Sequence, residues 1–308
     1  MDLELSDDQI ALRDGIQALL DGRFPMTRVR GGFDRSMWDD LAGAGALSLL
    51  ADGFAPADAV VVLEALGGAL VPGPIVDGVL AHALAPDGVV AVAPRPKPYE
   101  PLMLEYLDDV DALLVYDGAG VWRIDPADIE REPLVRPLDP LTPVARVVFL
   151  PEGEPLADAS VAEEWRRAGT VYTSAFLVGM AQRLTDMSVA YARERQQFDR
   201  PIGSFQAVKH LLADMVVRTE LARAAVYSAG AHLAALDEPG LERAVASAKV
   251  MAGVAAIANG KTATQVHGGM GFTWEVDVHL YLKRAWVLDT RFGSVDEHCD
   301  AVATSAVA

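Results

Sequence analysis

The stretch YARERQQFDRPIGSFQAVKHLLADM, which runs from Tyr191 to Met215, decides how this chain folds. Helical spacing leads up to it and resumes after it. Between the two helical patterns lies a short polar segment in which Pro201 and Gly203 interrupt the period, and Ser204 is placed to cap the helix that follows. The stretch therefore predicts two long helices joined by an exposed turn.

The turn carries side chains that suit a phosphate-bearing group. Arg195, Phe198 and Gln206 place a guanidinium, an aromatic face and an amide within reach of one bound molecule. A guanidinium fork matches a phosphate in two-point geometry. The alternative is that Arg195 is a surface charge near a helix end, Phe198 a hydrophobic plug and Gln206 a solvated residue of the first turn. Spacing alone favours this alternative.

A second segment, QVHGGMGF at 265–272, shifts the balance towards binding. Gly268, Gly269 and Gly271 allow positive φ angles and a close backbone approach, the condition under which amide hydrogens face a phosphate. A glycine-rich loop is weak evidence when it occurs alone. His267 lies within the segment, where a hydrogen bond to backbone is a more common role than a contact with a bound group.

The two segments together resemble the signature of the acyl-CoA dehydrogenase family, which has R-x-x-F-G, then F-Q, and later Q-x-x-G-G-x-G. The matching residues here are Arg195-Gln196-Gln197-Phe198-Asp199, Phe205-Gln206 and Gln265-Val266-His267-Gly268-Gly269-Met270-Gly271. Asp199 replaces the usual glycine. In the family these elements hold the adenosine-diphosphate half of a neighbouring subunit's FAD. The resemblance, specific over roughly 160–295, therefore implies FAD contacts from Arg195, Phe198, Gln206, Gln265, Gly268 and Gly269.

The rest of the sequence predicts a mainly α fold with a small β domain (α+β), as in that family. With 308 residues, of which 51% are hydrophobic, the chain can hold two or three packed units. Apolar spacing and short β-branched runs predict an N-terminal helical domain over 1–84, a reduced β domain over 85–155 and a C-terminal four-helix bundle over 156–308. The expected bundle helices cover about 158–195, 204–236, 241–266 and 275–291, and the small-residue tail 301–308 is expected to fray.

Composition limits the classes of partner. The formal charge is −18, with 44 acidic against 26 basic residues, which argues against nucleic acid or an anionic membrane as a partner. The N-terminus lacks the pattern of a signal peptide, and the apolar runs are too short to span a bilayer, so we expect a cytoplasmic protein. The six histidines are scattered without metal-ligand spacing, so no metal site is expected.

The catalytic base of the family is missing at both positions where members carry it. A gap-free alignment from the glycine-rich segment places Phe292 at the expected glutamate position, and a phenyl ring cannot accept a proton. The other family position, on the helix before the first turn, falls near Gly169, five or six residues from Glu163 and Glu164. Asp289, three residues before Phe292, is left as an alternative base, although a carboxylate at a helix end is more often solvated.

The set of family elements that this chain keeps and lacks resembles that of one kind of family member. The chain keeps the elements that hold a neighbour's FAD, and it lacks both the glutamate and the family's β-domain segments that line the flavin ring. It is similar to the non-catalytic subunit of the α2β2 acyl-CoA dehydrogenases that oxidise CoA thioesters of sterol side chains in actinobacteria. The resemblance implies a partner subunit that carries the glutamate and an acyl-CoA substrate. The alternatives are a self-sufficient acyl-CoA dehydrogenase with an unrecognised base and a non-enzymatic assembly protein.

Overall fold

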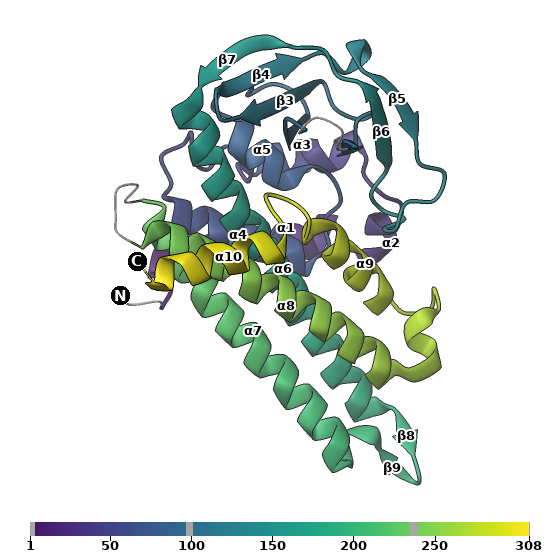
Figure 1. Cartoon of the computed structure of the whole chain (residues 1–308). Coiled ribbons are helices and arrows are strands. Elements are labelled where there is room, and N and C mark those ends of the chain that lie inside the picture. Colours follow the sequence, from purple (N-terminus) through teal and green to yellow (C-terminus); the bar gives the residue numbers. More distant parts are fainter. Residues whose placement is uncertain (1–3, 97–100, 235–239, 308) are drawn as a thin grey trace.

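The computed structural model describes residues 4–96, 101–234 and 240–307. Helices dominate, and a small β unit sits at one end of the longest of them (Figure 1). The prediction of a mainly α fold with a small β unit is therefore confirmed. None of the described helices has the length and apolar content that a bilayer crossing requires.

Five helices precede the β unit: α1 (Asp7–Arg23), α2 (Met26–Val29), α3 (Arg35–Gly43), α4 (Pro56–Gly68) and α5 (Ile75–Ala81). The capping box that begins α1 has the Gln9 amide donating to Ser6 Oγ at 3.2 Å and the Ser6 amide donating to Gln9 Oε1 at 3.1 Å. Helix α4 packs tightly on the bundle because Gly67 and Gly179 leave no room for a side chain. A Cβ atom at Gly179 would lie 1.8 Å from the Glu64 carbonyl oxygen.

The β unit contains two sheets. Its strands are β1 (Val90–Pro94), β2 (Met103–Glu105), β3 (Ala112–Asp117), β4 (Gly120–Ile124), β5 (Glu130–Pro133), β6 (Val144–Phe149) and β7 (Glu154–Asp158), with a 3₁₀ turn, η1 (Pro126–Asp128), before β5. One sheet has the order β1-β3-β4-β7, in which β1 and β3 are parallel, and the other has the antiparallel order β2-β6-β5. The buried strands β1 and β3 pack towards the helices and join a single core with them.

The C-terminal helices are α6 (Ala159–Glu194), α7 (Gln206–His232), α8 (Leu241–His267), α9 (Val278–Leu288) and α10 (Val295–Val307). Helices α6, α7 and α8 form the long part of the bundle, while α9 is shorter than predicted. Two expectations are corrected. The tail expected to fray is helical through Val307 because α10 packs on α8. Ser204 lies in a 3₁₀ turn, η2 (Ile202–Ser204), so Phe205 takes the N-cap position of α7.

A buried amide holds the three long helices in register. The Asn259 side chain on α8 donates to Thr219 Oγ1 at 2.9 Å and lies 3.1 Å from the Met215 carbonyl oxygen on α7. It also lies 3.3 Å from the Ala181 carbonyl oxygen on α6. Because a buried amide must find partners, this contact favours one axial alignment of the helices over others. The alignment fixes which residues meet at the end of the bundle.

Candidate functional site

The predicted turn between α6 and α7 is a β-hairpin at the far end of the bundle from the β unit (Figure 1). Strands β8 (Gln196–Gln197) and β9 (Arg200–Pro201) pair through a two-residue loop in which Phe198 has φ 53° and Asp199 has φ 63°. Two successive left-handed residues are what a tight hairpin of this type needs. Aspartate tolerates that conformation well enough to replace the family's glycine, whereas the phenylalanine costs roughly 1–2 kcal/mol.

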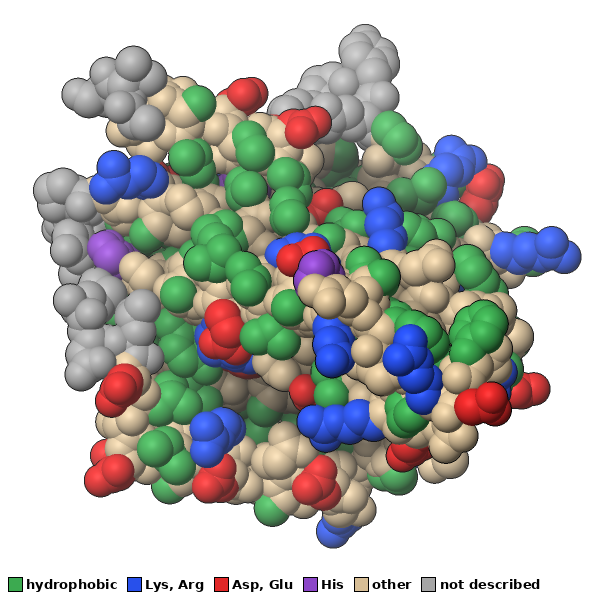
Figure 2. Space-filling model, turned by 90° about the horizontal axis from the view of Figure 1, so that it is seen from below, with side chains coloured by type: hydrophobic (Ala, Val, Ile, Leu, Met, Phe, Trp, Pro, Cys, Tyr) green, Lys and Arg blue, Asp and Glu red, His purple; other side chains and the backbone are tan. Residues whose placement is uncertain are grey.

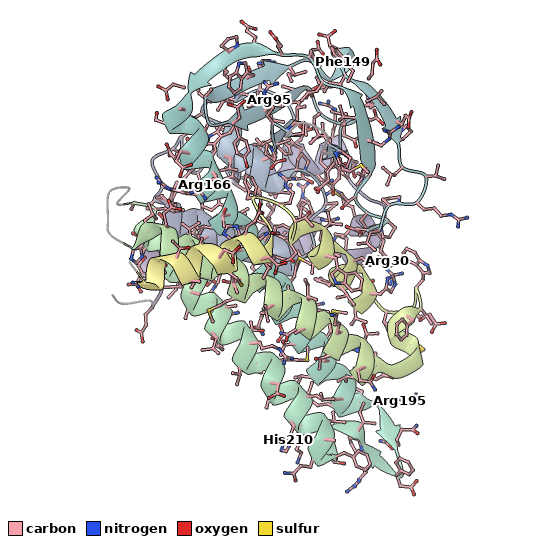
Figure 3. All side chains as sticks on the ribbon, viewed as in Figure 1. Arg30, Arg95, Phe149, Arg166, Arg195 and His210 are labelled. Atoms are coloured by element: carbon pink, nitrogen blue, oxygen red, sulfur yellow. The ribbon has the colours of Figure 1, made fainter. Side chains whose placement is uncertain are left out.

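Arg195 is exposed and its guanidinium has no ion-pair partner among the described residues. Its backbone is fixed, because its amide donates to the Tyr191 carbonyl oxygen at 2.8 Å and its own carbonyl accepts from Ile202 at 2.8 Å. Figure 3 shows Arg195 and His210 at this end of the bundle. The arrangement places a guanidinium that is unpaired among the described residues on a fixed backbone.

The other two residues predicted in the turn are also open to a ligand. Phe198 is 85% exposed, which excludes the interpretation of this ring as a hydrophobic plug, and it meets Phe205 edge-on at 6.0 Å between ring centroids. The exposed Gln206 amide nitrogen lies 3.3 Å from His210 Nε2. Figure 2 looks onto this end and shows Lys and Arg side chains gathered there, and Arg193, Arg200 and Lys209 join Arg195 as exposed cations. These four cations outnumber the two exposed carboxylates of the same stretch, Glu194 and Asp199, so this end is locally positive on a chain with a net negative charge.

The glycine-rich segment ends α8 and forms a 3₁₀ turn, η3 (Gly268–Phe272). Gly268 has φ 61°, and a Cβ atom at Gly268 or Gly269 would meet nothing within 4 Å. Both glycines and Gln265 are exposed. Gly271 differs from them, because a Cβ there would lie 2.7 Å from the Thr264 carbonyl oxygen. Gly271 therefore serves close packing against α8. Of the three glycines, Gly268 and Gly269 are the two whose backbone is open to a ligand.

The structure brings the hairpin and the glycine-rich turn together on one edge of the bundle. The Tyr191 ring, one helical turn before Arg195, stacks on His267 with 4.2 Å between ring centroids and 25° between ring planes. The Nδ1 atom of His267 lies 2.8 Å from the Ala263 carbonyl oxygen, the backbone contact expected for this residue. Burial lowers the pKa of His267, so the imidazole is neutral at pH 7. Two segments about 70 residues apart in the sequence thus share one surface.

The two positions considered for a catalytic glutamate meet at one point. A Cβ atom at Gly169 on α6 would lie 2.2 Å from Cε1 of the Phe292 ring, so the ring fills the space that any side chain at Gly169 would need. Phe292 is 7% exposed and stacks on Tyr116 of β3 with 6.3 Å between ring centroids. Glu163 is bound instead by Arg166 on the helix surface. Neither position places a carboxylate at this point.

Asp289 lies on another side of the loop that carries Phe292. Its Oδ1 atom is 2.2 Å from where a Cβ of Gly253 on α8 would stand, which places the carboxylate against α8. Burial raises the pKa of Asp289, and Lys249 opposes that shift. The charged group that acts most strongly on the Asp289 carboxylate is therefore Lys249, a buried lysine of α8.

A family model described as the acyl-CoA dehydrogenase C-terminal domain matches residues 165–307. The chain is 33% identical to the acyl-CoA dehydrogenase IpdE2 of Mycolicibacterium smegmatis, over 91% of this chain and 93% of that protein. The chain belongs to the acyl-CoA dehydrogenase family. Another relative in this family is IpdE2 of Mycobacterium tuberculosis, 34% identical over 82% of this chain and 81% of that protein. Among solved structures, a chain of the ChsE4-ChsE5 complex from Mycobacterium tuberculosis superposes with a TM-score of 0.86 at 25% identity, over 100% of this chain and 99% of that one.

In this acyl-CoA dehydrogenase chain, the space beside Phe292 holds a cluster of charged side chains that the sequence did not reveal, of which Asp77 is buried and Arg291 and Glu105 are half-buried. Arg291 of the Phe292 loop is paired with Asp77 of α5, and its Nη1 lies 3.4 Å from Glu105 Oε2 of β2. Burial raises the pKa of Asp77 to about 6, and Arg291 opposes the shift. A cavity of only about 30 Å³ is left between these residues, Arg284 and Tyr106. That volume holds a water molecule and excludes a substrate.

A much larger cavity of about 880 Å³ lies elsewhere, between α1, α4, α6 and α7. Its lining mixes opposite charges, including Arg13, Glu64 and Arg223, and contains none of the residues predicted to bind FAD. Arg223 there is already bound to Glu64 at 2.8 Å. Among the described residues, no group of three or more His, Cys, Asp or Glu side chains is arranged to hold a metal ion. The edge that carries Arg195 and Gly268 is therefore the better candidate site.

Lys249 holds the loop that carries Phe292, and it predicts a pH effect on stability. Its Nζ donates to the carbonyl oxygens of Leu288 at 2.9 Å and Arg291 at 2.8 Å, and burial lowers its pKa from 10.5 to about 8. Above pH 8 the unfolded chain keeps a proton that the folded chain has lost. The free energy of unfolding should therefore rise by about 1 kcal/mol between pH 8 and pH 9 through this group.

Urea unfolding at the two pH values measures this rise. The control is Lys249→Met, which keeps much of the volume but cannot titrate, and it should show a smaller increase with pH than the wild type. Equal increases in both proteins would contradict the role given to Lys249.

Proposed function

We propose that this chain is the non-catalytic subunit of a heteromeric, FAD-dependent acyl-CoA dehydrogenase. The observation that carries the proposal is the contact of Phe292 with Gly169. Both positions at which family members carry the glutamate converge there, and the space holds a phenyl ring. The family membership supports α,β-dehydrogenation of a CoA thioester as the reaction of the complex. The relation to the ChsE4-ChsE5 complex supports a second acyl-CoA dehydrogenase-like subunit as the partner.

The residues on the hairpin edge fit the ADP half of FAD. Arg195 offers a guanidinium that has no ion-pair partner in the described part of the chain, and Gly268 and Gly269 offer backbone with open space in front of it. Charge-assisted bonds of this kind contribute about 1.5–3 kcal/mol each. Phe198, Gln206 and Gln265 complete what we call the clasp, which would hold the partner's cofactor. All six clasp residues lie within 156–308, so on this proposal the segments 1–84 and 85–155 serve assembly.

The chemistry is divided between the subunits. When bound, FAD accepts a hydride from the β carbon of the thioester while a carboxylate removes the α proton. We propose that the partner supplies this carboxylate, in an α2β2 assembly that works in the cytoplasm. One structural relative, with a TM-score of 0.83 and 19% identity, is the Tcur3481-Tcur3483 steroid ACAD. We therefore propose a sterol side-chain thioester as the first substrate to test.

Flavin content separates this proposal from the alternatives. Expressed alone, the chain should be colourless, and it should become yellow when co-expressed with the partner subunit. A chain that is yellow alone and is reduced by an acyl-CoA would support a self-sufficient enzyme, for which Asp289 is the first residue to test. A chain that never gains flavin, with or without the partner, would indicate an assembly protein.

Arg195→Ala in the complex should weaken FAD binding about thirtyfold, because the loss of a desolvated phosphate contact costs about 2 kcal/mol. Flavin absorbance after gel filtration and dilution measures the retained cofactor. Arg195→Lys keeps the charge but loses the fork, so its FAD affinity should lie between those of the wild type and Arg195→Ala. Arg193→Ala removes an exposed charge two residues away and serves as the control for long-range electrostatics. Equal flavin retention in the Arg195→Ala and Arg193→Ala complexes would show that Arg195 is only a surface charge.

A further inference from the structure

The two halves of the clasp are each fixed to their own helix by a close backbone approach. In the hairpin half, a Cβ atom at Gly203 would lie 2.9 Å from the Ala192 carbonyl oxygen of α6. In the other half, Gly271 is held as closely against Thr264 of α8. Each half therefore moves with its helix, and the distance between Arg195 and Gly268 depends on how the ends of α6 and α8 are held together.

The stack of Tyr191 on His267 joins those two helix ends. Tyr191 precedes Arg195 by one turn, and the Tyr191 carbonyl oxygen accepts from the Arg195 backbone amide at 2.8 Å. His267 directly precedes Gly268. Another side-chain contact between α6 and α8, the Asn259 amide 3.3 Å from Thr185 Oγ1, lies eight residues earlier on α8, about 12 Å along the axis. The ring stack lies closer to the clasp than Asn259 does, at the helix ends that set the distance between Arg195 and Gly268.

Two features make the stack rigid. The rings are 4.2 Å apart at 25°, an arrangement close to parallel stacking. The His267 ring cannot turn freely, because it is buried and its Nδ1 is within 2.8 Å of the Ala263 carbonyl oxygen. A neutral imidazole with Nδ1–H donating to that carbonyl keeps one tautomer and one orientation.

We infer that Tyr191 and His267 are positioning residues for FAD: their stack sets the distance between the Arg195 guanidinium and the Gly268–Gly269 backbone, and thereby the affinity of the clasp for the ADP half of the cofactor. Neither side chain needs to touch FAD for this effect. The inference rests on the proposed function, and it adds two residues that the six clasp residues do not include.

The test is the FAD dissociation constant of the co-expressed complex, followed by flavin fluorescence during titration of the FAD-free complex. Tyr191→Leu keeps an apolar side chain but removes the stack, and should raise the dissociation constant about three- to tenfold, the effect of one aromatic pair. Tyr191→Phe keeps the ring and should stay within about twofold of the wild type. His267→Leu should resemble Tyr191→Leu. Tyr191→Leu and His267→Leu both leave an apolar side chain that can be buried, and the melting temperature of each variant checks that it folds.

A double-mutant cycle separates positioning from general loosening. If the stack is the element that matters, Tyr191→Leu with His267→Leu should weaken FAD binding no more than either single variant does. Effects that multiply in the double variant, or wild-type affinity in both single variants, would overturn the inference.

Arg195→Ala tells these failures apart from a failure of the proposed function. If Arg195→Ala weakens FAD binding while Tyr191→Leu does not, the clasp stands and the positioning role is wrong. If neither variant changes FAD binding, the clasp itself is wrong, and both proposals fall together.

Discussion

Replacing Asp139 by alanine should lower the free energy of unfolding by about 3–5 kcal/mol, the range found when one member of a buried ion pair is removed. Asp139 is bound to Arg284 of α9, and the two side chains are 0% and 4% exposed. Asp139 Oδ2 also accepts from Thr142 Oγ1 at 2.7 Å, and Oδ1 accepts from the Leu141 amide at 3.0 Å. The alanine variant leaves the Arg284 charge buried without its partner, and that is the main source of the loss.

The pair deserves this test because it ties the β unit to the helical bundle. Asp139 lies between β5 and β6, whereas Arg284 lies beside Arg291 at the small cavity near Phe292. Urea denaturation compared with wild type measures the effect. The exposed pair Arg146–Glu132, with side chains 48% and 63% exposed, is the matched control, and Glu132→Ala should change stability by less than about 1 kcal/mol.

A double variant and one contrary result complete this test. The double variant Asp139→Leu with Arg284→Met should recover much of the stability, because apolar side chains of similar volume can replace a buried ion pair. An Asp139→Ala protein as stable as Glu132→Ala would mean that water reaches Arg284 and that the pair is not isolated from solvent.

The long bundle helices were predictable because each has enough turns for its apolar face to show. The expected boundaries 158–195 and 241–266 differ by at most one residue at each end from Ala159–Glu194 and Leu241–His267. Strands β2, β5 and β7 were not predicted, since all three are short, and β5 and β7 also have no buried residue and contain a proline each. Helix α10 was missed because its packing on α8 is a tertiary contact that small residues in a tail do not reveal.

The candidate site was predictable as a list of residues and unpredictable as an arrangement. Sequence patterns identified Arg195 and Gly268, but only the fold shows that Tyr191 and His267 bring them to one edge. The same holds for the two positions at which the family carries its base. Two separate alignments pointed to Phe292 and Gly169, which are 123 residues apart (292 − 169), and nothing in the sequence indicates that a ring at one position fills the space at the other.

If the partner carries the glutamate, as we propose, its removal should reduce the rate of flavin bleaching by an acyl-CoA at least about a hundredfold. The loss of a general base costs ~10²–10⁴-fold, and on the same proposal this chain offers no second base. The structural reason is the filled space at Gly169 together with the position of Asp289 against α8. Rapid-mixing absorbance of the complex with a CoA thioester measures the rate. The complementary variant, Phe292→Leu in this chain, keeps an apolar side chain and should leave the rate within a few fold of wild type.

Phe292→Glu provides the strictest form of this test, since it returns a carboxylate to the family position. We expect no new activity from it, even with the partner's glutamate removed. The space around Phe292 is taken up by Tyr116 and by the ion pair of Arg291 with Asp77, and the cavity of about 30 Å³ beside them admits no thioester. A new glutamate there would meet Arg291, whose guanidinium lies 5.3 Å from the centre of the present ring. Such a carboxylate would be held in its charged form by an ion pair, with no substrate proton within reach.

Substantial bleaching in the complex that lacks the partner's glutamate, before any change at Phe292, would mean that this chain carries a base of its own. Asp289→Asn would then show whether that base is Asp289.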